Sequence, residues 1–134
     1  MLIHLDSKID TVNQIETVNH DLVFKLPYIP FGLDDFEIKI VQLLIVWNQP
    51  VLPLYGFLTS TIIDKSVLNP TQQLLAFSQS KKNNYLLYTP MHPERYIIQR
   101  QNFETADFHL ELSEKHKIKR IKLILEISNV NRYQ

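Results

Sequence analysis

Regular alternation of apolar and polar residues in the stretch 102–129 constrains the fold of this chain more than any other feature. Apolar side chains occupy every second position over residues 106–112, and the pattern returns over residues 121–127. Successive side chains of a β-strand point to opposite faces, whereas a helix of about 3.6 residues per turn would spread these positions around its circumference. The pattern therefore predicts two half-buried strands joined by a polar turn at residues 113–117.

The same alternation predicts which side chains enter the core. Phe108, Leu110, Leu123 and Leu125 should face one core, and Asp107, Glu111, Lys122 and Glu126 should face outward. Only an apolar set can be buried at low cost, so this register is strongly specified.

Other short segments also have the composition of strands. They are residues 22–26, 36–47, 54–63, 74–77, 85–88 and 96–99, and residues 2–5 could form a short first strand. The segment 36–47 also has the apolar spacing of a helix, but its five β-branched residues and its early alternation favour a strand. About eight strands without a secure helix predict an all-β antiparallel sandwich, a single jelly roll.

The connections between these strands are marked by polar clusters and prolines. Residues 78–84 form a polar cluster that predicts a hairpin between its two flanking strands. All seven prolines fall between the expected strands, and Pro50 and Pro53 should end the strand 36–47. At 134 residues the chain should form one domain over 20–129, with an N-terminal strand or arm at 1–19 and a tail at 130–134.

Composition excludes several classes of protein. Lys plus Arg equals Asp plus Glu at 14 each, and the absence of a basic surplus disfavours nucleic-acid binding. The chain has no cysteine, which removes disulfide scaffolds, thiol catalysis and cysteine-ligated zinc. The start of the chain does not have the pattern of a signal peptide, and the longest apolar run, residues 43–47, is too short to span a membrane.

Two groups of residues could form sites, and each has a simpler structural explanation. His109 shares the outer face of its strand with Asp107 and Glu111, which could ligate a metal but more simply form a solvated face. Asp34 and Asp35 could be paired carboxylates, but they read better as loop residues. Two glycines cannot build a phosphate-binding loop or a dinucleotide fingerprint. The sequence therefore predicts no catalytic, cofactor-binding or metal-binding residue, and no enzyme.

Two further clusters could contact a partner. Five Lys or Arg residues lie within 115–122 and could meet an acidic partner or a phosphate, although a polar turn and an exposed strand face explain them equally. Tyr85, Tyr88 and Tyr96 with Phe77 resemble a platform for stacking bases or sugars, but core aromatics of a sandwich are the simpler explanation.

The order of several short motifs resembles the penton, or minor capsid, proteins of Polintons and related double-stranded DNA viruses. The motifs are Leu54-Tyr55-Gly56-Phe57, Thr61-Ile62-Ile63-Asp64, Gln73-Leu74-Leu75, Tyr85-Leu86-Leu87, residues 93–98, Asn102-Phe103-Glu104-Thr105 and Phe108-His109-Leu110-Glu111-Leu112, and the stretch 36–47 is similar to a strand of their N-terminal half. The chain departs from that family at residues 113–117, where an Asp-Asp-x-Gly turn is usual, and in a shorter segment between Trp47 and Tyr55.

The resemblance implies a structural virion component of an icosahedral double-stranded DNA virus or virus-like element. Its expected partners are copies of itself, as a pentamer or other cyclic homo-oligomer, and a major capsid protein, with neither nucleic acid nor a membrane span. Its expected location is the capsid, assembled in the host cell. The alternative is a small β-sandwich binding module for a carbohydrate or a peptide, using Tyr85, Tyr88 and Tyr96.

Overall fold

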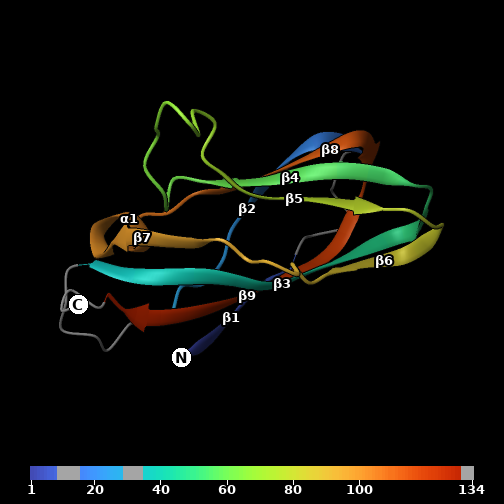
Figure 1. The fold of residues 1–134 in the computed structure, drawn as a ribbon. Coiled ribbons are helices and arrows are strands. Elements are labelled where there is room, and N and C mark those ends of the chain that lie inside the picture. Colours follow the sequence, from blue (N-terminus) through green and yellow to red (C-terminus); the bar gives the residue numbers. More distant parts are fainter. Residues whose placement is uncertain (9–15, 29–34, 131–134) are drawn as a thin grey trace.

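The computed structural model describes residues 1–8, 16–28 and 35–130, which form two antiparallel sheets packed face to face (Figure 1). The elements are β1 (Leu2–Lys8), β2 (Thr17–Leu22), β3 (Asp35–Val51), β4 (Leu54–Ser60), β5 (Gln73–Gln79), β6 (Asn83–Tyr88), β7 (Arg95–Gln99), α1 (Arg100–Glu104), β8 (Phe108–His116) and β9 (Ile118–Asn129). The predicted all-β sandwich is confirmed.

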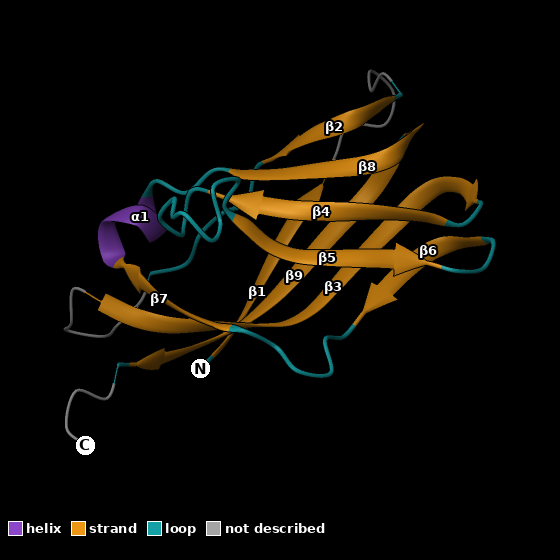
Figure 2. Ribbon diagram, turned by 45° about the horizontal axis from the view of Figure 1, so that its top comes forward, coloured by secondary structure: helices purple, strands orange, loops and turns teal. Residues whose placement is uncertain are grey.

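The strands alternate between the two sheets along most of the chain. Sheet A has the order β1-β9-β3, and the far side of β3 pairs with β7 along its first part and with β6 along its second part. Sheet B has the order β2-β8-β4-β5, so that β2 and β5 are its edges (Figure 2). The long strand β3 thus pairs on this side with two shorter strands, β7 and β6, which follow one another along its edge.

Buried and more exposed side chains alternate along the two terminal strands, β8 and β9, as the sequence predicts. Phe108, Leu110, Leu123 and Leu125 are buried, whereas Asp107 and Glu111 are exposed and Lys122 and Glu126 are half-buried. The turn between the strands is shorter than expected, because β8 continues to His116. The strands also do not pair with each other: β8 lies in sheet B and β9 in sheet A, so their connection crosses the sandwich.

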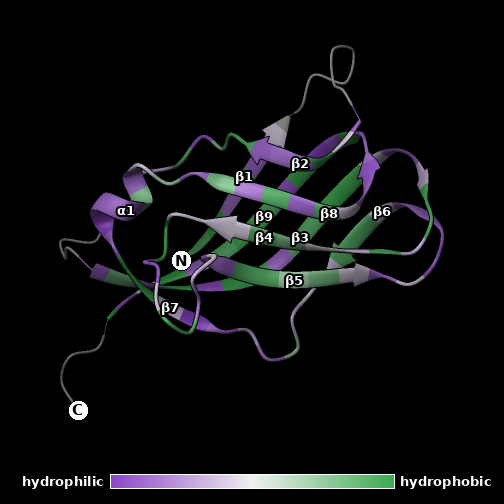
Figure 3. Cartoon of the chain, turned by 90° about the horizontal axis from the view of Figure 1, so that it is seen from above, coloured by the Kyte–Doolittle hydropathy of each residue, from purple (hydrophilic) through white to green (hydrophobic). Residues whose placement is uncertain are grey.

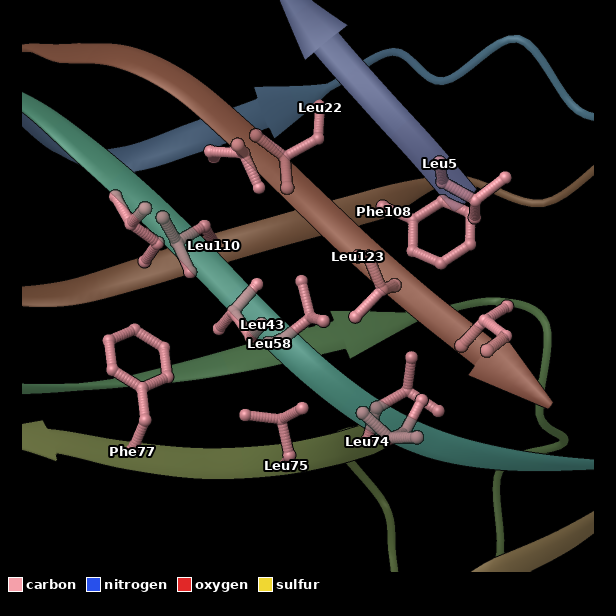
Figure 4. Packing of buried hydrophobic residues seen from close by; sticks show 14 of the residues in the cluster. Leu5, Leu22, Leu43, Leu58, Leu74, Leu75, Phe77, Phe108, Leu110 and Leu123 are labelled. Atoms are coloured by element: carbon pink, nitrogen blue, oxygen red, sulfur yellow. The ribbon is translucent and has the colours of Figure 1, made fainter. Parts of the chain in front are cut away.

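The core lies between the sheets and draws apolar side chains from both. Figure 4 shows Leu43 and Leu123 of sheet A beside Leu58 and Leu110 of sheet B, and all four are fully buried. Apolar bands cross the strands, while α1 is mostly hydrophilic (Figure 3). Within α1 only Phe103 is buried, and its ring packs edge-on against Phe36 at 5.5 Å.

Two expectations about connections are wrong. Residues 78–84 do not close a hairpin, because β5 pairs with β4 in sheet B and β6 pairs with β3 in sheet A. Pro50 does not end a strand but lies inside β3. The pairing of β3 with β6 shifts register between Val46 and Val51, and a proline is tolerated at such an irregularity because no ladder hydrogen bond is needed from it.

The N-terminal part of the chain belongs to the sandwich. Leu2–Lys8 pairs with β9 along its whole length, so the strand predicted at 2–5 is confirmed and extended, and this part of the chain is not an arm. The strand predicted at 22–26 instead occupies Thr17–Leu22, and the strand predicted at 54–63 ends at Ser60. Residues 9–15 of the predicted arm, and 131–134 of the predicted tail, lie outside the described residues.

The described residues contain no helix with the length and apolar character needed to cross a membrane. α1 has five residues.

Candidate functional site

A cleft of about 800 Å³ lies on the open side of the sandwich, where β5 of sheet B lies across from β6 and β7 of sheet A. Its walls come from the β4–β5 loop, the edge strand β5, and the β6–β7 loop. The side chains that matter most are Leu68, Ala76, Tyr88, Glu94 and Tyr96. The cleft exists because both sheets end here without a strand that joins them.

The Tyr96 hydroxyl group joins the sheets at one end of this cleft. It lies 2.9 Å from the carbonyl oxygen of Leu74 on β5 and 2.9 Å from a carboxylate oxygen of Glu94. Burial raises the pKa of Tyr96, and the hydrogen bond to the Glu94 carboxylate raises it further. Tyr96 is therefore a neutral hydrogen-bond donor at physiological pH, and it bridges the sheets rather than acting as a base.

The four aromatic residues proposed as a stacking platform do not lie together. Tyr88 and Tyr96 line the cleft, but Tyr85 lies on the outer face of sheet A and Phe77 is buried in the core. The reason is the pleat of β6, which sends Leu86 and Tyr88 inward and Tyr85 outward. The prediction of a four-residue stacking platform is therefore wrong, whereas the alternative prediction of a core aromatic is confirmed for Phe77.

His109 has a partner that the sequence pattern did not indicate. Its Nδ1 lies 2.8 Å from a carboxylate oxygen of Asp21 on the neighbouring strand β2. No group of three His, Cys, Asp or Glu side chains within residues 1–8, 16–28 and 35–130 could hold a metal ion. The remaining histidines are His4 on β1, His20 on β2, His92 in the cleft and His116 against Trp47.

His20 is a buried titratable group away from the cleft. Its Nε2 lies 3.0 Å from the carbonyl oxygen of Thr17, so this nitrogen must carry the proton and donate it. Burial lowers the pKa of His20, and the neighbouring His109 lowers it as well, while the Thr17 carbonyl acts in the opposite direction. The neutral ring is therefore the form that this site favours.

The other candidate charges are spread over the surface. Asp35 begins β3 opposite Gln99, and Asp34 lies outside the described residues. Of the five cations at 115–122, Arg120 pairs with both carboxylate oxygens of Asp6 on β1. Lys115 lies at the end of β8 in sheet B, and Lys122 on β9 in sheet A. These cations therefore do not all belong to one sheet.

The cleft offers backbone groups, aromatic rings, the Glu94 carboxylate and the His92 imidazole. The cleft could not be predicted from the sequence, because Ala76 and the prolines that line it form no recognisable motif. A usable signal was the pair of proline-containing loops, 64–73 and 89–94, which flank the strands.

No protein-family model, curated protein or solved structure matches this chain.

Proposed function

We propose that this chain is a structural subunit of an icosahedral shell, a penton-like or minor capsid protein of a double-stranded DNA virus or virus-like element. The observation that carries the proposal is the strand order, β1-β9-β3-β6/β7 facing β2-β8-β4-β5. A jelly roll has two four-stranded sheets whose strands are joined by repeated crossings, and it is widely used by viral capsid proteins. Because one fold serves several functions, the proposal needs support from the surface as well.

The outer face of sheet A supports the proposal, because it has apolar side chains that assembly would cover. Tyr85 and Leu87 of β6 are 47% and 54% exposed there, opposite the half-buried Val46 and Leu44 of β3. The outer face of an isolated antiparallel sheet is usually polar. An exposed apolar patch in its place indicates a contact surface.

The outer face of sheet B carries a second, different patch. Tyr55 is 60% exposed and packs edge-on against Phe57, with ring centroids 6.3 Å apart. A contact between two different surfaces of identical subunits is heterologous, and such contacts generate rings when the rotation closes. The two patches therefore suit a cyclic homo-oligomer in which sheet A of one copy meets sheet B of the next, with a major capsid protein around the ring.

Complementation between two variants tests the ring. The double variant Tyr85→Lys/Leu87→Lys should lose the sheet A contact, and Tyr55→Lys should lose the sheet B contact. Neither should self-associate, but an equal mixture keeps one intact contact and should give dimers only. Native mass spectrometry at high protein concentration measures this, with thermal melts as the control for folding. Association of either variant alone at wild-type strength would contradict the proposed contact.

The shell itself is tested in cells that make the protein. We expect the chain in purified virus-like particles, at a fixed ratio to a major capsid protein, by quantitative mass spectrometry. Its absence from such particles, with the protein free in the cytosol, would overturn the shell proposal.

A further inference from the structure

The direction of the backbone groups along β4 shows which groups of β5 face outward. The N–H of Tyr55 donates to the Ser113 hydroxyl oxygen on β8 at 3.1 Å, and the N–H of Ser60 donates to the Gln72 carbonyl at 3.0 Å. Backbone groups of successive residues in a strand point to opposite sides. Residues 54, 56, 58 and 60 therefore bond toward β5, and 55, 57 and 59 toward β8.

Register then assigns the groups of β5. Phe77 is opposite Gly56 and Leu75 is opposite Leu58, so these two residues of β5 bond to β4. The backbone N–H and C=O groups of Ala76 and Ser78 must therefore point away from β4, in the plane of the sheet and beyond its edge. The carbonyl of Leu74 is already bonded to Tyr96. Within residues 1–8, 16–28 and 35–130, the outward backbone groups of Ala76 and Ser78 have no hydrogen-bond partner.

The unpaired edge opens onto the cleft. Ala76 lines the cleft together with Tyr88 and Tyr96 from the opposite sheet and Leu68 from the β4–β5 loop. Leu68 is 97% exposed, so an apolar side chain placed beside it would bury surface that now contacts water. A strand laid along β5 would find backbone partners on one side and apolar or aromatic side chains beneath it.

Charges of opposite sign mark the two ends of this edge. The Glu94 carboxylate is held at the Leu74 end, since the Tyr96 hydroxyl group contacts both residues. Lys81 and Lys82 are exposed just beyond Gln79, at the other end of β5. A complementary segment has a basic residue at the first end and an acidic residue at the second.

We infer that the β5 edge is a binding site for an extended peptide segment of another protein, which adds to sheet B as a fifth strand. The segment has apolar side chains at alternate positions, a basic residue facing Glu94 and an acidic residue facing Lys81 and Lys82. Main-chain hydrogen bonds give such complexes their affinity, and the alternate side chains give them specificity. The inference goes beyond the shell proposal, because the isolated chain binds the segment whether or not it assembles.

A variant that removes only the outward N–H groups provides the test. Ala76→Pro/Ser78→Pro deletes two edge donors that β4 does not use, and prolines are tolerated on edge strands in this orientation. The matched control is Ala76→Gly/Ser78→Ala, which keeps both N–H groups. Thermal melts of both variants establish that each is folded before binding is measured.

The probe is a phage library of random dodecapeptides, selected on the full-length chain. We expect enriched peptides with alternating apolar residues, and synthetic copies should bind the wild type and the control variant equally in fluorescence anisotropy. The proline variant should bind them about tenfold more weakly or worse, the effect of losing two hydrogen bonds. Methylation of every second backbone nitrogen of the peptide should weaken binding to a similar extent when the methylated set faces β5. Methylation of the other set should have little effect.

Other results overturn the inference. Failure to enrich any peptide would show that the edge does not accept a strand. Enriched peptides that bind the folded proline variant as tightly as the wild type would place the contact elsewhere. Since the assay uses the isolated chain, neither result bears on whether the chain is found in particles.

Discussion

The indole Nε1–H of Trp47 donates a 3.0 Å hydrogen bond to the side-chain oxygen of Gln79, and this bond joins β3 of sheet A to β5 of sheet B inside the core. The Gln79 amide nitrogen in turn donates to the carbonyl oxygens of Val51 and Lys81, at 2.9 and 3.1 Å. The buried amide of Gln79 in sheet B thus satisfies two groups of β3 in sheet A and one group of the connection 80–82 between the sheets.

Gln79→Ala should lower the free energy of unfolding by about 2 kcal/mol, because the indole N–H and two carbonyl groups lose a buried partner. Urea denaturation measures the change, and Trp47, the only tryptophan, reports it by fluorescence. Ser80→Ala, at an exposed neighbouring position, is the control and should be close to neutral. Equal stabilities of the two variants would show that the Gln79 hydrogen bonds add nothing net.

Leu110→Asp should unfold the chain or cost more than about 4 kcal/mol, because an unpaired charge would replace a fully buried side chain. Glu111→Ala, one residue along the same strand, should change stability by about 0.5 kcal/mol or less. Denaturant melts of both variants test the register of β8. Similar tolerance of the two substitutions would mean that the facing of this strand is misassigned.

The chain should lose stability as the pH falls below about 6.5, in part through His20. The unfolded ring binds a proton near that pH, whereas burial lowers the pKa in the folded chain. The unfolded state then holds more protons, so the free energy of unfolding decreases with decreasing pH and is fully retained above pH 6.5.

His20→Gln should make this decline shallower, and His92→Gln, in an exposed loop, is the comparison variant. Urea midpoints measured from acid to neutral pH give the slopes. A slope unchanged by His20→Gln would remove His20 from the explanation.

Gly56→Ala should destabilise the chain by about 1–3 kcal/mol through overpacking. The added Cβ would lie 2.6 Å from the Glu111 carbonyl oxygen and 2.7 Å from Cζ of Phe77. Phe77 can shift its ring, but the carbonyl belongs to the paired backbone of β8. The double variant Gly56→Ala/Phe77→Leu should therefore lose at least as much free energy of unfolding as the two single variants lose together. Full rescue by Phe77→Leu would show that the ring alone opposes the added methyl group.

The amino-acid sequence by itself determined the fold class and the facing of its clearest strands. Alternation is a local property of the backbone, so Phe108, Leu110, Leu123 and Leu125 could be assigned to the core from their spacing alone. The strand at 36–47 was likewise predictable, although β3 continues past Trp47 to Val51. A register slip of one residue would expose every one of these apolar side chains, which is why the pattern is so informative.

Only the tertiary structure decided which strands are neighbours. A period of two indicates that a segment is a strand but not which segment it pairs with, since β6 and β9 both pair with β3, which lies far away along the chain. The connections at 78–84 and 113–117 therefore resembled hairpins, although both cross between sheets. Pairing across distant strands also brought His109 to Asp21 and placed Tyr88 and Tyr96 of sheet A across from the unpaired edge of β5 in sheet B. The candidate site depends on where each sheet ends, and backbone hydrogen bonds between distant segments decide that.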